Sequence, residues 1–242
     1  MDIKELAIPL VGSMIQQNAS SAALAKKITE LLEEASFSQM QESIEKLKFL
    51  MSCYRCALLE IETKFHVLNE QFSLRHERNP IEIIKTRIKS PESIQEKLER
   101  RSLPLTPSSL EQLHDIAGIR VICSFIDDIY LLANCLLLQD DIRLIEQKDY
   151  IKNPKDNGYR SLHLIIEVPI FLQNEKRFMK VEVQLRTIAM EFWANLEHKL
   201  CYKKSLSPEI SQLTSEELSQ CAEMSAQLDL KMQHVRDIIQ NS

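Results

Sequence analysis

Apolar positions recur every three or four residues through the first third of the chain, which predicts helices without strands there. Two helices are expected, over residues 1–35 and 38–72. The pattern ends at RHERNP, because Pro80 disfavours a helical conformation at the residue before it. Residues 1–74 are therefore expected to form a helical N-terminal segment.

From residue 75 the pattern changes to short runs separated by turn residues. Strands or extended segments are expected at PIEIIKTRIK, IAGIRVICSFI and IRLIEQKDYI. Short helices are expected at SPESIQEKLERR, with Ser90 as the cap and Pro91 at the first helical position, and from Asp127 to Leu138. The segment SLPLTPSS is expected to be a loop.

Two segments of period two, YRSLHLIIEVPI and RFMKVEVQLRT, are separated by a short polar turn and predict an antiparallel hairpin. A helix, IAMEFWANLEHKLCYK, follows with Ile188, Phe192, Leu196 and Leu200 on one face. This order predicts an α+β fold over residues 75–204, a mixed sheet flanked by helices. Neither GxGxxG nor GxxxxGK[ST] occurs, so the chain has no Rossmann fingerprint and no P-loop.

Residues 205–242 predict one more helix, with Ser207 as the cap and Pro208 after it. Its apolar residues follow a near-heptad spacing: Ile210, Leu213, Cys221, Met224, Leu228, Met232, Val235 and Ile239. Two interpretations stay open, because such a seam packs either on its own domain or against another subunit.

Composition is that of an ordinary globular chain of 242 residues, 44% hydrophobic and 27% charged. No apolar run approaches the roughly 18 residues that span a bilayer, and the start lacks the pattern of a secretory signal. The six cysteines lie mostly among apolar neighbours, which favours reduced thiols and a cytoplasmic location. The CYRC pair at 53–56 is more typical of packing than of zinc binding.

Net charge is −5, which argues against a general nucleic-acid binder. The charge is unevenly distributed: residues 1–79 hold nine Lys/Arg and eleven Asp/Glu, residues 80–204 hold nineteen and eighteen, and residues 205–242 hold two and six. A site for an anionic ligand is therefore expected in the middle segment.

Strand periodicity gathers polar side chains on one face of the hairpin. Tyr159 and His163 share the side opposite the apolar residues of the first strand, and Glu182, Gln184 and Arg186 do so in the second. A functional face is favoured, and a solvated sheet face is the alternative.

The loop before the hairpin is basic and carries one of only three glycines in the chain, Gly158. Lys148, Lys152, Lys155 and Arg160, with a permissive glycine backbone, predict a phosphate clamp, and Tyr159 could stack on a base. The alternative is simple turn chemistry, because Asp-Asn-Gly forms turns by itself.

A second glycine, Gly118, lies inside a predicted strand, where glycine usually marks close approach. Asp115 precedes it, and pairing with Glu182 would give the two carboxylates of a Mg²⁺ site. Upstream, KTRIK places three cations on one side, either around an anion or as charges guarding an edge strand.

Three separated motifs, HDIAGIRVICSF, NGYRSLHL and VEVQLRTIAMEFWANLEHKLCYK, resemble the synthetase domain of the RelA/SpoT family over roughly residues 75–204. NPIEIIKTRIKSPESIQEKLERR also fits. With no hydrolase domain in front and no regulatory region behind, the chain is similar to the stand-alone small alarmone synthetases.

The resemblance implies a nucleotidyltransferase-like fold and transfer of the β,γ-pyrophosphate of ATP to the 3′-hydroxyl of GDP or GTP. It implies Mg²⁺ bound by Asp115 and Glu182, with Glu182 also taking the proton of the hydroxyl. It implies an ATP site of Arg87, Lys89, Ser93 and Arg120. It implies an acceptor site of Lys148, Lys152, Lys155, Tyr159, His163, Gln184 and Asn195.

The family's small members form homotetramers through terminal helices, so a homo-oligomer is expected here. The N-terminal forty residues and loop 101–109 are particular to this chain. The former could cover the site, modify assembly or bind a regulator such as a nucleotide or RNA. Two further functions stay open: transfer to adenine nucleotides or tRNA, and a non-catalytic nucleotide- or RNA-binding regulator.

Overall fold

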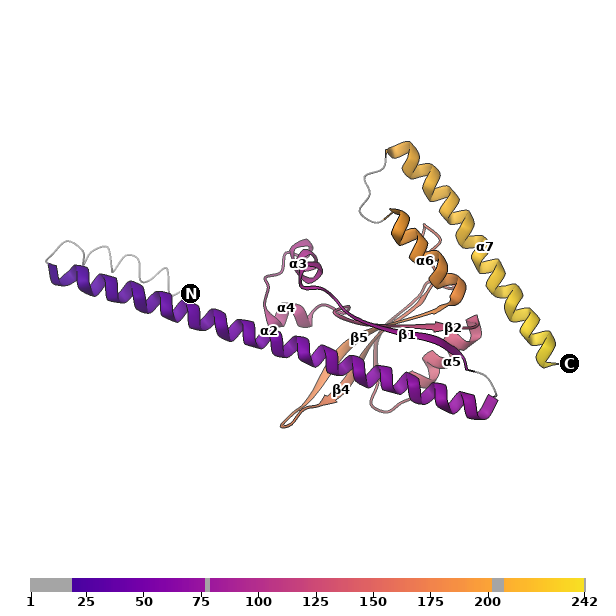
Figure 1. The fold of residues 1–242 in the computed structure, drawn as a ribbon, viewed down its shortest axis with the longest axis horizontal. Helices are drawn as coiled ribbons and strands as arrows, with labels where there is room; N and C mark the ends of the chain where they lie inside the picture. Colours follow the sequence, from indigo (N-terminus) through magenta and orange to yellow (C-terminus); the bar gives the residue numbers. More distant parts are fainter. Residues whose placement is uncertain (1–18, 77–78, 202–206, 242) are drawn as a thin grey trace. The chain divides into compact units, whose positions relative to one another are not determined.

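A computed structural model describes residues 19–76, 79–201 and 207–241. Residues 1–50 and 51–242 form two compact units. The second unit contains a five-stranded mixed sheet in the order β1-β2-β5-β4-β3 (Figure 1). The strands are β1 Ile81–Ile88, β2 Ala117–Cys123, β3 Arg143–Asp149, β4 Leu162–Phe171 and β5 Lys176–Thr187. The expected α+β fold is thus confirmed.

The centre of the sheet is the pair β2 and β5, which run parallel, while every other pair is antiparallel. β4 and β5 form the expected hairpin, with Leu164 opposite Val183. Alternation gives this sheet one apolar face, on which Val121, Leu164 and Val183 are completely buried. The other face carries the polar residues and forms the candidate site.

Six helices accompany the sheet in the described residues: α2 Ala19–His76, α3 Pro91–Arg100, α4 Pro107–Glu111, α5 Ile126–Leu137, α6 Ile188–Cys201 and α7 Pro208–Gln240. α5 lies against β2 and β5. α2 is tied to the rest of the unit at two points, by the Tyr54 hydroxyl donating to the Leu110 carbonyl and by Lys64 donating to Asp141. The core extends along α2 through Ile61 and Phe65, which are fully buried.

Several helix predictions are confirmed and two are wrong. The Ser90 side chain caps α3 by accepting from the Ser93 amide, as expected. However, α2 is one continuous helix across the expected break at residues 36–37, and residues 1–18 lie outside the described part. SLPLTPSS is only partly a loop, because Thr106 caps α4 by accepting from the Ser109 amide, and Pro107 occupies the first turn.

The face of α6 that carries Ile188, Phe192, Leu196 and Leu200 is its exposed side. The helix packs through neighbouring positions that include Trp193, which lies in one buried cluster with Ala222 of α7. α6 thus has apolar residues on two sides, and α7 covers the side of Trp193.

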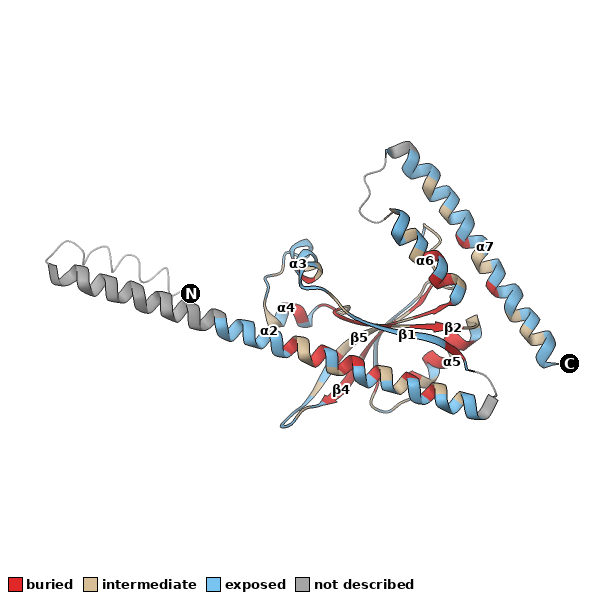
Figure 2. Cartoon of the chain, in the orientation of Figure 1, coloured by how far each residue is buried: buried red, intermediate tan, exposed pale blue. Residues whose placement is uncertain are grey.

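All eight residues of the seam on α7 are exposed, so the interpretation that the seam packs on its own domain is wrong (Figure 2). The buried positions of α7 among its described residues are Ala222 and Asp229, on the side toward α6. Three bonds fix that side, from Trp193 Nε1 to the Leu218 carbonyl, from Ser225 Oγ to the Ala189 carbonyl, and from Thr187 Oγ1 to Asp229 Oδ2.

All six cysteines are free thiols, and Cys53 of the CYRC pair is buried on α2, as packing predicts. In the described residues, no cluster of three or more His, Cys, Asp or Glu side chains suits a metal ion. None of the helices in that part of the chain combines the length and apolar character needed to cross a membrane.

Candidate active site

Strand register lines up the predicted site residues across the polar face of the sheet. One row runs through all five strands: Lys85, Arg120, Gln184, His163 and Lys148. The next row brings Arg87 of β1 beside Gly118 of β2, and Gly118 beside Glu182 of β5. Residues far apart in the sequence thus share one surface because β2 and β5 pair.

Asp115 lies just before β2 and is held by two lysines. Lys89 Nζ lies 2.6 Å from its Oδ2, and Lys97 Nζ lies 2.7 Å from its Oδ1. Burial raises the pKa of the Asp115 carboxyl, but the two lysines outweigh this effect and hold the pKa below its ordinary value. Asp115 is therefore ionised at neutral pH.

Glu182, on β5, is hydrogen-bonded by Gln184 Nε2 at 3.0 Å and lies 3.4 Å from His163 Nδ1. Burial raises the pKa of Glu182, but the contacts with His163 and Gln184 outweigh this effect and hold the pKa below its ordinary value. The negative charge of Asp115 opposes that shift. Asp115 lies three residues before Gly118, the neighbour of Glu182 in the sheet. Carboxylates are suitable ligands for a hard cation, and the Mg²⁺ site of these two residues stays a prediction.

Glu191, on α6, is a buried carboxylate that the sequence analysis did not single out. It contacts three cations, Lys85 Nζ at 3.2 Å, Arg120 Nη1 at 3.1 Å and Arg186 Nη1 at 3.0 Å. Its sequence signal is weak, since an isolated Glu among the apolar residues of an amphipathic helix is ordinarily solvent-facing.

Tyr159 lies at the entrance of β4 in contact with two predicted neighbours. Its hydroxyl lies 2.8 Å from His163 Nε2 and accepts from Arg186 Nη2 at 2.5 Å. Tyr150, which the sequence analysis left aside, stands edge-on to both rings, with centroids 6.0 Å from Tyr159 and 5.2 Å from His163. The Lys155 ammonium lies 4.9 Å from the Tyr159 ring centroid, so a cation covers this aromatic group.

The basic loop is shaped by Asp149 at the end of β3. Its Oδ1 accepts from the amides of Ile151 and Lys152, both at 3.0 Å, and the Tyr130 hydroxyl of α5 donates to the same carboxylate. The ammonium of Lys152 then lies over the Tyr130 ring. The loop is therefore held by side chains at its first turn.

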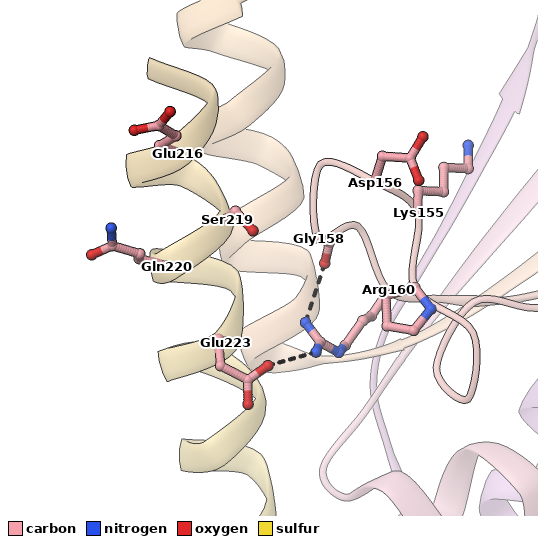
Figure 3. Close-up of a pocket in the computed structure, with 9 residues that line it drawn as sticks. Lys155, Asp156, Gly158, Arg160, Glu216, Ser219, Gln220 and Glu223 are labelled. Carbon is pink, nitrogen blue, oxygen red and sulfur yellow. Dashed lines mark hydrogen bonds and ion pairs between the residues drawn. The ribbon is translucent and has the colours of Figure 1, made fainter. Parts of the chain in front are cut away.

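Gly158 has a different surrounding from the one expected. Its φ is +86°, and a Cβ added there would lie 2.5 Å from the Cβ of Ala222 on α7. Arg160, which was predicted to belong to the phosphate clamp, instead donates to the Gly158 carbonyl and to Glu223 (Figure 3). It also donates to the Ala222 carbonyl and so reinforces the contact with α7. The glycine thus serves the packing of the loop on α7, over a crevice of about 560 Å³.

Gly118 contrasts with Gly158. A Cβ there would meet Arg87 Cγ at 3.6 Å and the Glu182 carbonyl at 3.9 Å, which are ordinary contacts. The fold therefore does not require glycine at this position. Gly118 is buried, and the Arg87 side chain lies over it beside the Glu182 backbone, so a methyl group at this position would touch Arg87.

The remaining predicted residues lie at the edges of this surface. Arg87 is exposed on β1, and Ser93 belongs to the first turn of α3, where its hydroxyl accepts from Ser90. Lys148 is exposed and pairs with Glu146 at 3.1 Å. Asn195 bonds to Glu191 on its own helix, and so lies beside the cations of β1 and β2.

Comparison with known proteins gives matches over most of the chain. Residues 86–207 match the model of the region found in RelA/SpoT proteins. GTP pyrophosphokinase YwaC of Bacillus subtilis is 45% identical over 202 residues, which are 83% of this chain and 95% of that protein. GTP pyrophosphokinase YjbM of the same organism is 35% identical, over 78% and 88% of the two chains.

Solved structures of similar proteins have the same fold as this chain. Small alarmone synthetase 2 from Bacillus subtilis superposes with a TM-score of 0.69 at 44% identity, covering 77% of this chain and 96% of that one. Small alarmone synthetase 1 from the same organism, bound to its product pppGpp, gives 0.72 at 33% identity over 81% and 99%. On the family model, the identities and the shared fold, the chain belongs to the RelA/SpoT family.

Proposed function

We propose that this protein is a (p)ppGpp synthetase, a transferase that moves the β,γ-pyrophosphate of ATP to the 3′-hydroxyl of GDP or GTP. Its membership of a family whose similar members are named GTP pyrophosphokinases supports the reaction. The observation that carries the proposal for the site is the sheet register, which places Glu182 of β5 beside Gly118 of β2, three residues after Asp115, on a sheet face rich in cations.

On the donor side, the triphosphate of ATP is bound by cations of β1 and β2, which are Arg87, Lys89 and Arg120, with Ser93 near the phosphates. Phosphoryl transfer depends chiefly on positioning and on neutralising charge, and these side chains supply both. Gly118 supports this placement, because a residue without a side chain lets Arg87 lie close to the strand, beside Glu182.

On the acceptor side, Lys148, Lys152 and Lys155 bind the phosphates and the Tyr159 ring stacks on guanine, with His163, Gln184 and Asn195 nearby. The contact of Lys155 with the Tyr159 ring has a consequence here. A base that stacks on this face of the ring displaces the ammonium, which then becomes available for the acceptor phosphates.

Glu182 accepts the proton of the 3′-hydroxyl as that oxygen attacks the β-phosphorus of ATP. The bond between the β-phosphorus and the oxygen bridging to the α-phosphate breaks, and AMP leaves. The lowered pKa of Glu182 means that this carboxylate is ionised at neutral pH, as an acceptor of the proton must be. Asp115 and Glu182 would together hold Mg²⁺, which when bound neutralises charge on the transferring phosphates.

The test is transfer of label from γ-³²P-ATP in the presence of Mg²⁺ to GDP, GTP, ADP or bulk tRNA, offered separately. We expect labelled ppGpp and pppGpp, and loss of both in Asp115→Ala. Glu182→Gln should abolish transfer while ATP and GDP still bind, because the amide keeps the shape of the side chain but cannot accept the proton. Near-normal turnover in Glu182→Gln would remove Glu182 from the chemistry.

The same assay separates the alternatives. If label appears only in tRNA or adenine nucleotides, the reaction is the same but the acceptor differs. If no label is transferred, a non-catalytic regulator that binds nucleotides or RNA is favoured. A nucleotide or RNA effector and a cytoplasmic location stay predictions.

We infer in addition that the protein is a homo-oligomer, with a tetramer favoured. The support is an apolar groove of about 1200 Å³ between α6 and α7, lined by Ile188, Phe192, Met224, Leu228 and Met232, which are all exposed.

A further inference from the structure

Glu191 is the most enclosed carboxylate on the polar face of the sheet. It belongs to the first turn of α6 and is 7% exposed. Its three cationic partners come from three different strands, Lys85 from β1, Arg120 from β2 and Arg186 from β5. One carboxylate therefore fixes the relative positions of three cations that would otherwise repel one another.

The charges do not balance within this cluster. One negative charge faces three positive ones, which leaves an excess positive charge at the surface where anionic nucleotides are proposed to bind. Burial raises the pKa of Glu191, but the charge of Arg120, the bond from Asn195 and the charge of Arg186 outweigh it and lower the pKa. Glu191 is thus ionised at neutral pH and attracts all three cations.

Arg186 extends the cluster toward the acceptor side. Its Nη1 donates to Glu191, while its Nη2 donates to the Tyr159 hydroxyl at 2.5 Å and to Gln184 Oε1 at 3.1 Å. Gln184 in turn donates to Glu182. Glu191 is therefore connected through one side chain to the ring proposed to stack on guanine and to the proposed base.

We propose that Glu191 is a positioning residue that aligns the donor and acceptor halves of the site, with Arg120 and Lys85 on one side and Arg186 with Tyr159 on the other. The inference rests on the proposed function, since it assigns ATP and the guanine nucleotide to these two halves. Glu191 touches neither nucleotide in this scheme and acts through the cations that it holds.

Replacement of the carboxylate separates alignment from binding. Glu191→Gln keeps the size of the side chain but removes its charge, so the three cations move apart while the positive potential of the site increases. We expect kcat to fall by about 10- to 100-fold, because small misplacements of reacting groups are costly. The dissociation constants of ATP and GDP should be unchanged or lower, since no cation has been removed.

A matched control is Asp229→Asn, which removes a carboxylate of similar burial, 8% exposed, outside the site. This control should leave kcat unchanged. Glu191→Asp keeps the charge but is shorter, so it should retain more kcat than Glu191→Gln. Thermal unfolding will show whether Glu191→Gln is folded. If it is not, Glu191→Asp is compared with the wild type, and the inference predicts a lower kcat with unchanged affinity for both nucleotides.

A double-mutant cycle tests the route through Arg186. Glu191→Gln and Tyr159→Phe both disturb the position of Arg186, so their effects on kcat should be clearly less than multiplicative. Multiplicative effects, a kcat of at least half the wild-type value in Glu191→Gln, or nucleotide affinity lost in proportion to kcat would each overturn the inference. A wild-type protein that transfers no label to GDP or GTP would instead overturn the proposed function itself.

Discussion

Gly118 and Gly158 differ in what a methyl group would meet. At Gly158 both the backbone and the neighbouring helix oppose a side chain, whereas at Gly118 neither does. Gly158 is therefore required by the fold, whereas Gly118 is explained by the side chain that lies over it. The two positions make opposite predictions about stability and binding.

Gly158→Ala should destabilise the protein. The positive φ alone costs about 1–2 kcal/mol for a residue with a Cβ, and the clash with Ala222 adds to this cost. Thermal unfolding should show a lower midpoint, and the KM for the acceptor should rise as the loop moves away from α7. Adding Ala222→Gly should restore part of the stability, because it removes the clash and leaves the φ. A midpoint equal to that of the wild type would contradict this account.

Gly118→Ala should leave stability unchanged or raise it by up to about 0.5–1 kcal/mol, because alanine suits a strand better than glycine does. Binding of ATP should nevertheless weaken, since the methyl group would touch the Arg87 side chain beside Glu182. Isothermal titration with a non-hydrolysable ATP analogue measures this directly, with GDP binding as the internal comparison. Unaltered affinity for the analogue would mean that the nucleotide lies elsewhere.

At the scale of elements, a buried acid of α7, Asp229, binds Thr187 at the end of β5, just before α6 begins. Burial raises the pKa of Asp229 above its ordinary value, although the Thr187 hydroxyl donates to it and Arg160 lies near. A carboxyl with a raised pKa in the folded state costs stability when ionised, and this cost disappears as the pH falls through the raised pKa.

Asp229→Asn should therefore stabilise the protein at pH 7–8, by a few degrees in the unfolding midpoint if the gain is about 1 kcal/mol. The amide oxygen can still accept from Thr187. The advantage over the wild type should shrink as the pH is lowered toward the ordinary value of 3.8. An advantage that is constant with pH would show that ionisation is not its cause.

The strands were predictable because their signals are local. Alternation in β4 and β5 identified the hairpin, and with it the contact of Tyr159 with His163 and of Glu182 with Gln184. The pairing of β2 with β5 was not readable in this way, since parallel neighbours leave no mark on the sequence between them. The pairing of Asp115 with Glu182 was therefore only a hypothesis from the sequence, which the family resemblance supported.

The helices show why the rest escaped prediction. α6 has apolar residues on two sides, and periodicity alone could not decide which side the sheet covers, so Glu191 was overlooked on the buried side. Thr106 followed by Pro107 is a helix-start signal, but two prolines within five residues were interpreted as a loop. Gly158 was read as freedom for a ligand-binding loop, because the helix that it contacts follows some sixty positions later.

At the scale of the whole molecule, the apolar groove between α6 and α7 predicts assembly. Light scattering at micromolar concentration should give the mass of an oligomer, with a tetramer favoured. Leu228→Glu with Met232→Glu should lower that mass, because charges would be buried in the contact. Leu138→Glu is the control, as Leu138 is equally apolar and 84% exposed but lies outside the groove. A monomeric wild type would contradict the inference.

The pairing of β2 with β5 also governs the order in which the chain folds. β4 and β5 are neighbours in sequence and can form their hairpin early, whereas β2 must close a loop that contains α5, β3 and β4 before it pairs with β5. Asp115 and Glu182 come together only at that late step. A chain with its hairpin and its basic loop but without this pairing has no paired carboxylates, so the proposed transfer requires the complete sheet.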